Sequence, residues 1–135
     1  MNIDSIQNGI VIDHITAGKG MKLVQLLDLD REDVSVAIIK NVHSQKMGKK
    51  DIIKIDAEIP VDLDLIGYVD PGATVNIIRR GDLVEKKSIA RPKQLINVIR
   101  CKNPRCITSV EQEIRHVFHL TDDGYRCMYC ETRAE

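Results

Sequence analysis

Four cysteines near the end of the chain constrain its fold more than any other feature of the sequence. They form two close pairs, Cys101 with Cys106 and Cys127 with Cys130, and twenty residues separate the pairs. Each pair can supply two thiolates from one tight turn, and a hairpin in the spacer can bring the pairs together around a tetrahedral metal ion. The spacing therefore predicts one structural zinc ion per chain.

Two alternatives to a zinc site remain open on spacing alone: two disulfides, or four unconnected thiols. The first residues contain neither a basic segment nor an apolar run typical of a signal peptide, which favours a reducing, cytoplasmic setting and thus the metal site. Two histidines of the spacer, His116 and His119, could replace a thiolate but are expected to be hairpin residues. Four sulfur ligands would close the coordination shell, so the metal is expected to be structural rather than catalytic.

Composition argues against two classes of partner. The chain of 135 residues carries 20 basic and 20 acidic side chains, and residues 93–135 carry 7 and 6 of these, so the cysteine-rich part has no marked basic excess. Aromatic residues make up only 3%, too few for a base-stacking surface. A zinc-ribbon module that binds nucleic acid is therefore the alternative rather than the leading hypothesis. No apolar stretch approaches the length of a membrane span.

The hydrophobic pattern before the cysteines predicts an α+β domain over residues 1–91, followed by a small antiparallel β zinc-ribbon-type domain over residues 92–135. A break at Pro92 separates the two, since proline disfavours continued strand pairing. In the first domain we expect a ferredoxin-like antiparallel sheet with two helices on one face. The expected strands are residues 3–6 (weak), 9–15, 33–42 (covered on both faces), 49–56, 74–79 and 83–88, the expected helices are 21–27 and 58–66, and a strand of the zinc hairpin is expected at 115–120.

No catalytic group is evident in the sequence. The Gly18-Lys19-Gly20 segment is too short for a phosphate-binding P-loop. Asp13 and His14 could act as an acid–base pair, although such neighbours more often contact a ligand or lie at the surface. Two lysines on otherwise apolar strands, Lys54 and Lys86, are either solvated or converge on phosphate groups.

Taken together, these segments resemble the regulatory chain of aspartate carbamoyltransferase along nearly the whole sequence. The similarity rests on N-G-I-V-I-D-H-I at residues 8–15, G-K-K-D-I-I-K-I at 48–55, A-T-V-N-I-I at 73–78, and the four-cysteine set. The resemblance implies a non-catalytic subunit for the control of pyrimidine biosynthesis. Its first domain would bind ATP as activator and CTP, with UTP, as inhibitor. Its zinc domain would dock on the catalytic chain, with regulatory homodimers bridging two catalytic trimers.

The resemblance also assigns roles to individual residues. It places the base beside Asp4, Ser5 and Ile6, and the ribose beside Asp13 and Lys54. It places the phosphates beside His14, Asn76, Lys86 and the backbone of Leu83. Two departures from the family pattern bear on specificity: the amino-terminal arm that helps to hold a second nucleotide in some members is shorter here, and Gly81 takes the place of a bulkier side chain beside the base.

Overall fold

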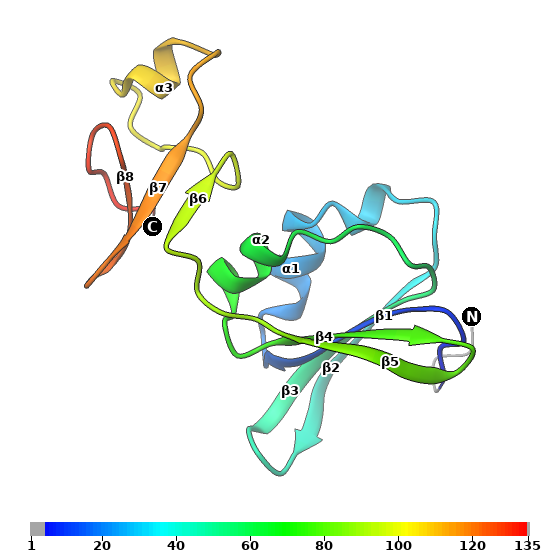
Figure 1. Cartoon of the computed structure of the whole chain (residues 1–135). Coiled ribbons are helices and arrows are strands. Elements are labelled where there is room, and N and C mark those ends of the chain that lie inside the picture. The colour runs from blue at the N-terminus through cyan, green and yellow to red at the C-terminus, as the bar shows by residue number, and fades with distance from the viewer. Residues whose placement is uncertain (1–4, 135) are drawn as a thin grey trace. The chain divides into compact units, whose positions relative to one another are not determined.

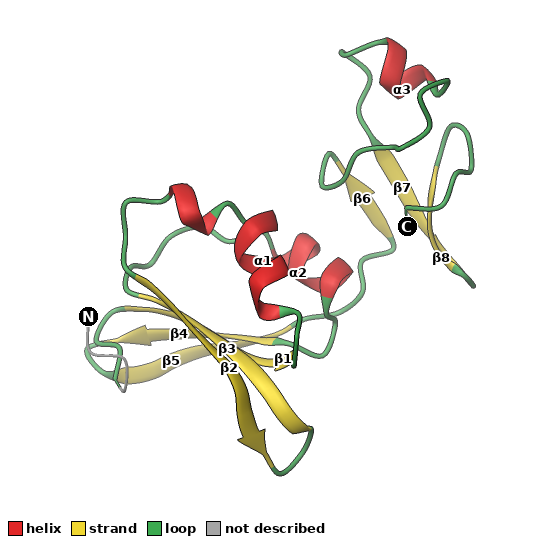
Figure 2. Ribbon diagram, turned by 180° about the vertical axis from the view of Figure 1, so that it is seen from behind, coloured by secondary structure: helices red, strands yellow, loops and turns green. Residues whose placement is uncertain are grey.

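The computed structural model describes residues 5–134, and the chain divides into two compact units, Met1–Ala90 and Arg91–Glu135. The elements of the first unit are β1 (Gly9–Thr16), α1 (Gly20–Leu26), a short 3-10 turn (Leu29–Arg31), β2 (Val36–Ser44), β3 (Gly48–Ile55), α2 (Leu63–Val69), β4 (Thr74–Arg79) and β5 (Asp82–Ser88). The five strands pair antiparallel in the order β2-β3-β1-β4-β5 (Figure 1). Both helices lie on one face of this sheet (Figure 2), which confirms the predicted α+β class.

Alternation along the three central strands separates the two faces of the sheet. Ile12, Ile53 and Val75 are fully buried, and we therefore assign them to the face of the sheet that the helices cover. Each such side chain stabilises the fold by roughly 1.5–3 kcal/mol relative to an exposed position. The neighbouring residues in each strand point to the opposite face, where no helix lies. The open face is therefore free to carry polar side chains.

A β-bulge interrupts the pairing of β1 with β3. Ile12 pairs with Ile53 and Ile15 with Asp51, so two residues of β1, Asp13 and His14, lie opposite one residue of β3. His14 adopts a left-handed conformation with φ of 57°. The additional residue changes the phase of the alternation. As a result, Ile12 and Ile15 are both buried although they are three residues apart.

The predicted limits of the second helix were wrong. The helix begins at Leu63 rather than near residue 58, because the Asp62 side chain caps it by accepting hydrogen bonds from the Asp64 and Leu65 amides at 3.1 and 3.2 Å. Gly67, expected to end the helix, lies buried inside it. The helix continues to Val69, so Gly67 does not act as a stop signal.

The strand expected at residues 33–42 is present as β2, but the prediction that it is covered on both faces was wrong. That strand, β2, lies at an edge of the sheet, and its apolar residues from Val36 to Ile39 are only half-buried. A weak strand was expected at residues 3–6. Residues 3 and 4 lie outside the described part of the chain, and Ser5 and Ile6 are not in a strand.

The turn that joins β4 to β5 consists of Arg80 and Gly81. Their φ angles are 53° and 80°, so both residues of this two-residue turn are left-handed.

The second unit contains a three-stranded antiparallel sheet and one turn of helix. Its elements are β6 (Gln94–Ile96), α3 (Ile107–Val110), β7 (Val117–Thr121) and β8 (Gly124–Cys127), and the strands pair in the order β6-β7-β8. Leu95, Phe118 and Cys127 form its buried centre. β7 corresponds to the predicted strand, whereas β6 and α3 were not predicted. Across residues 5–134, no helix is long and apolar enough to cross a membrane.

Candidate metal centre and ligand pocket

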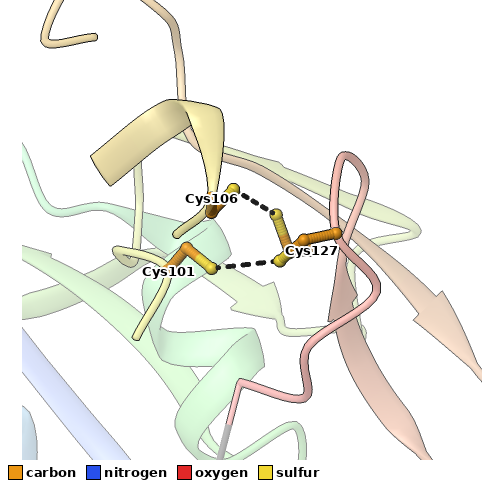
Figure 3. Close-up of side chains that lie close together, drawn as sticks. Cys101, Cys106 and Cys127 are labelled. Atoms are coloured by element: carbon orange, nitrogen blue, oxygen red, sulfur yellow. Dashed lines mark hydrogen bonds between the residues drawn. The ribbon is translucent and has the colours of Figure 1, made fainter. Parts of the chain in front are cut away.

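The four cysteine sulfurs converge on one point in the second unit. Cys101 Sγ lies 3.5 Å from Cys130 Sγ, Cys106 Sγ lies 3.7 Å from Cys127 Sγ, and all four sulfurs lie within 4.8 Å of one another (Figure 3). A tetrahedron with metal–sulfur bonds of about 2.3 Å has edges of about 3.8 Å. The four cysteines are free thiols, which leaves the disulfide alternative without support. The spacing of the sulfurs therefore fits a tetrahedral metal ion.

Short secondary-structure elements hold these ligands in place. Cys106 directly precedes α3, and its sulfur accepts a hydrogen bond from the Thr108 hydroxyl at 3.1 Å. Cys127 ends β8, and its amide donates to the Thr132 carbonyl at 2.9 Å. The Cys101 amide donates to His116 Nδ1 at 3.1 Å. Each of these ligands is thus oriented by backbone or hydroxyl contacts around the cluster.

Without a cation, this arrangement of sulfurs opposes ionisation at two of the four positions. Burial raises the pKa of Cys101 to about 12 and also raises the pKa of Cys127, because a thiolate loses its hydration there. At Cys130 the hydrogen bond with Thr132 lowers the pKa to about 6. A bound divalent cation would offset the repulsion among four neighbouring thiolates, so binding the metal and releasing the thiol protons are linked.

The two spacer histidines lie outside the cluster. His116 Nδ1 is occupied by the Cys101 amide, and His119 Nε2 lies 3.1 Å from a Glu131 carboxylate oxygen. Both histidines therefore have hydrogen-bonding partners other than a metal. The part of the chain that the structure describes contains only the four cysteines in a metal-competent group.

A second candidate site lies on the open face of the sheet in the first unit. It is a cavity of about 410 Å³, within the range of small-molecule sites. Its lining comes from the four adjacent strands β3, β1, β4 and β5, from the residues before β1 and from the turn that joins β4 to β5. The lining residues are Ser5, Ile6, Val11, Asp13, Ile52, Lys54, Asn76, Ile78, Gly81 and Leu83.

Six of the predicted ligand-contacting residues meet in this cavity: Ser5, Ile6, Asp13, Lys54, Asn76 and Leu83. His14 and Lys86 do not line it, although Lys86 pairs directly with Asn76 across β4 and β5. Asp4 lies outside the described residues. These residues share the open face of the sheet, because the central strands, rather than the outer ones, carry most of them.

Comparison with known proteins identifies the family of this architecture. Residues 1–90 match the family described as aspartate carbamoyltransferase regulatory chain, allosteric domain, and residues 93–135 match the metal binding domain of the same chain. The aspartate carbamoyltransferase regulatory chain of Clostridium tetani is 50% identical over 135 residues, covering 97% of this chain and 94% of the relative. Those of Clostridium botulinum and Bifidobacterium longum are 48% and 44% identical, covering 97% and 100% of this chain and 92% and 99% of the relatives.

The chain belongs to the aspartate carbamoyltransferase regulatory chain family. Its relatives are regulatory rather than catalytic subunits, which confirms the expectation of a non-catalytic protein. A regulatory chain implies a catalytic chain as its partner. The family match also confirms that the four-cysteine unit is a metal-binding domain.

One charged residue beside the cavity of this regulatory chain was missed in the sequence. Lys50 Nζ lies 3.0 Å from Asp13 Oδ1, and both side chains are largely buried. Burial of Asp13 opposes ionisation, but the hydrogen bonds from Lys50 and from the His14 amide lower its pKa overall. Stability from this pair is therefore present above the ordinary aspartate pKa and is lost as the pH falls through the lowered value. Lys50, Ile52 and Lys54 alternate along β3, so period-two spacing could have revealed Lys50.

One row of paired residues crosses the open face of the regulatory chain's sheet. Lys54 pairs with Val11, Val11 with Asn76, and Asn76 with Lys86, so these side chains point to the same side. Among the described residues, the Asn76 Oδ1 atom is buried without a hydrogen-bonding partner. Because an unpaired buried acceptor destabilises a fold, the cavity can be stabilised by a ligand that brings a donor to this atom.

Proposed function

We propose that the first unit of this regulatory chain binds the nucleotide effectors ATP and CTP on the open face of its sheet. The observation that carries the proposal is the gathering of six residues, predicted from the family resemblance, around one cavity of about 410 Å³. Apolar side chains from Val11, Ile52 and Ile78 provide a surface for a base, while Asp13 provides acceptors for ribose hydroxyls. UTP, as a further pyrimidine nucleotide, is part of the same proposal.

The charges around the cavity suit a triphosphate. Lys54 lines the cavity, and Lys86 lies on the same face, where it pairs directly with the lining residue Asn76. His14 lies beside Asp13 at the bulge, where its Nδ1 is 3.0 Å from Thr74 Oγ1. We propose that Lys86 and His14 reach the phosphates from the rim, while Lys54 and Asn76 contact the ligand inside. Charge-assisted hydrogen bonds of this kind each contribute about 1.5–3 kcal/mol.

The variant Lys86→Ala tests the nucleotide site. We expect it to weaken ATP and CTP together by roughly ten- to a hundredfold, because one charge-assisted hydrogen bond to the phosphates is lost. Isothermal titration calorimetry on the purified chain measures both affinities. Lys87→Ala is the matched control: Lys87 is the next residue of β5 and pairs with the buried Val75, so its side chain leaves the opposite face. Equal affinities for wild type and Lys86→Ala would remove Lys86 from the site.

We further propose that the metal held by Cys101, Cys106, Cys127 and Cys130 is a single structural zinc ion. Four sulfur donors within 4.8 Å of one another suit zinc, and a reducing cytoplasm would keep them available as ligands. The four thiolates would hold the ion and fill its coordination shell, so no position would be left for a substrate. We expect one equivalent of zinc per chain by elemental analysis. Substantially less zinc in carefully purified protein, or a different metal in its place, would contradict the assignment.

For the second unit we propose a docking role on the catalytic chain. Four large apolar side chains close in sequence to the cysteines are exposed: Ile107 and Val110 on α3, directly after Cys106, and Met128 and Tyr129 between Cys127 and Cys130. Exposed apolar side chains grouped in this way are typical of interaction surfaces. In the full proposal two regulatory chains form a homodimer, and three such dimers bridge two catalytic trimers. The outer edges of β2 and β5, which pair with no other strand among the described residues, are available for further contacts.

A further inference from the structure

One buried carboxylate, that of Asp51 on β3, has no role in the proposed nucleotide contacts. The Asp51 side chain is fully buried. Its Oδ2 accepts hydrogen bonds from the Gly18 and Gly20 amides, each at 3.0 Å, and its Oδ1 accepts one from the Asn41 amide at 3.0 Å. Gly20 must lack a side chain, because a Cβ atom there would lie 2.9 Å from Asp51 Oδ2. The site is thus built closely around this carboxylate.

These contacts lie next to the bulge that presents Asp13 and His14. Asp51 pairs with Ile15, the residue directly after the bulge, and the neighbouring Lys50 binds Asp13. Two of the three amides that Asp51 holds, those of Gly18 and Gly20, belong to the segment that continues β1 into α1, and the third, that of Asn41, belongs to β2. Asp51 therefore fixes the end of β1 in the register that leaves two residues of β1 opposite Ile52.

The conformation of His14 requires such support. A left-handed residue that is not glycine is strained, and it persists only where its surroundings allow no relaxation. If the end of β1 were released, the strand could slip and the bulge could move or disappear. The Thr16 amide is held in addition by Asp70 Oδ2 at 2.5 Å, and Lys19 Nζ donates to the Val69 carbonyl at 3.1 Å. Among the described residues, however, only the Asp51 side chain accepts from the Gly18 and Gly20 amides.

We infer that Asp51 is a positioning residue of the nucleotide site: it holds the β1 bulge in the register that presents Asp13 and His14 to the ligand. The inference rests on the proposed function and deepens it. Asp51 does not line the cavity, so its effect on a ligand must pass through the bulge.

The variant Asp51→Asn tests this role in the full chain. An amide group cannot accept all three hydrogen bonds, because its nitrogen is a donor. We expect the Kd for ATP to rise roughly tenfold, as for the loss of about one hydrogen bond to the ligand. The control is Asp62→Ala. It removes another carboxylate that accepts hydrogen bonds from backbone amides, but this carboxylate caps α2 and does not contact the segment after the bulge. The control should destabilise the fold and leave the Kd unchanged when both variants are measured well below their Tm.

A double variant separates positioning from a general loss of structure. If Asp51 acts through the bulge, Asp51→Asn should add little to the effect of His14→Ala, whereas independent effects would multiply. Should Asp51→Asn fail to fold, Gly20→Ala offers a milder displacement of the same carboxylate and should also weaken ATP. A folded Asp51→Asn chain with wild-type affinity, or multiplicative effects, would overturn the inference alone. A wild-type chain that binds no nucleotide would overturn the proposed function together with it.

Discussion

Replacing Cys127 by serine should unfold residues 91–135 and leave residues 1–90 folded. Cys127 is fully buried and its sulfur lies 3.7 Å from that of Cys106, so its loss removes a ligand from the centre of the unit. Structural zinc contributes about 10–16 kcal/mol of apparent binding free energy in small zinc domains. That exceeds the stability that so small a hydrophobic core provides by itself. Amide hydrogen exchange of the full chain, compared between its two units, measures the effect.

The control for this variant is Met128→Ser in the same cysteine loop. Met128 is exposed and contributes no ligand, so the control should keep one zinc ion and the exchange protection of the second unit. The first unit should remain protected in both variants, because its core consists of its own strands and helices. Retained protection of β7 and β8 in Cys127→Ser would contradict a metal-dependent fold.

Removing the metal should release the regulatory chain from its catalytic partner. The exposed apolar residues of the proposed docking surface lie on α3, directly after Cys106, and between Cys127 and Cys130, in two segments that the sulfurs hold together. Without the metal these segments lose their common anchor, and the shape of the surface is lost with it. We expect a chelator to convert the complex into free catalytic subunits that keep their activity but no longer respond to ATP or CTP, since coupling between sites requires the assembled complex.

Sedimentation velocity of the complex before and after chelation measures this dissociation. Adding zinc back should restore both the assembly and the nucleotide response, which distinguishes loss of the metal from damage by the chelator. The variant Val110→Asp provides an independent test, because it places a charge on the exposed face of α3 without touching a ligand. A metal-free regulatory chain that still binds the catalytic subunit with unchanged affinity would show that docking uses another surface.

The sequence was most informative where one residue type has one dominant use. The cysteine pairs predicted the convergence of sulfurs because thiolates at this spacing have few other roles in a reducing environment. The alternation along residues 49–56 likewise separates Ile53 and Ile55, which are fully buried, from Ile52 and Lys54 on the other face. These predictions needed only local spacing.

Features that depend on tertiary contacts could not be predicted in the same way. The start of α2 depends on an Asp62 cap preceded by an extended segment, whereas the apolar spacing from residue 58 suggested an earlier start. β6 and α3 span only three and four residues, too few for a periodic pattern. The bulge at His14 changes the phase of β1, and simple alternation has no means of indicating such a change.

That bulge can also be viewed as a single inserted residue in an otherwise regular strand. Without it, β1 and β3 would pair continuously, and no residue of β1 would need the strained left-handed conformation. The same deletion would leave one position, rather than two, opposite Ile52 for the polar side chains of the proposed site. A chain selected only for stability would therefore tend to lose this residue, and one selected for ligand response would keep it. Thermostabilising changes in β1 should accordingly be screened for nucleotide response before they are adopted.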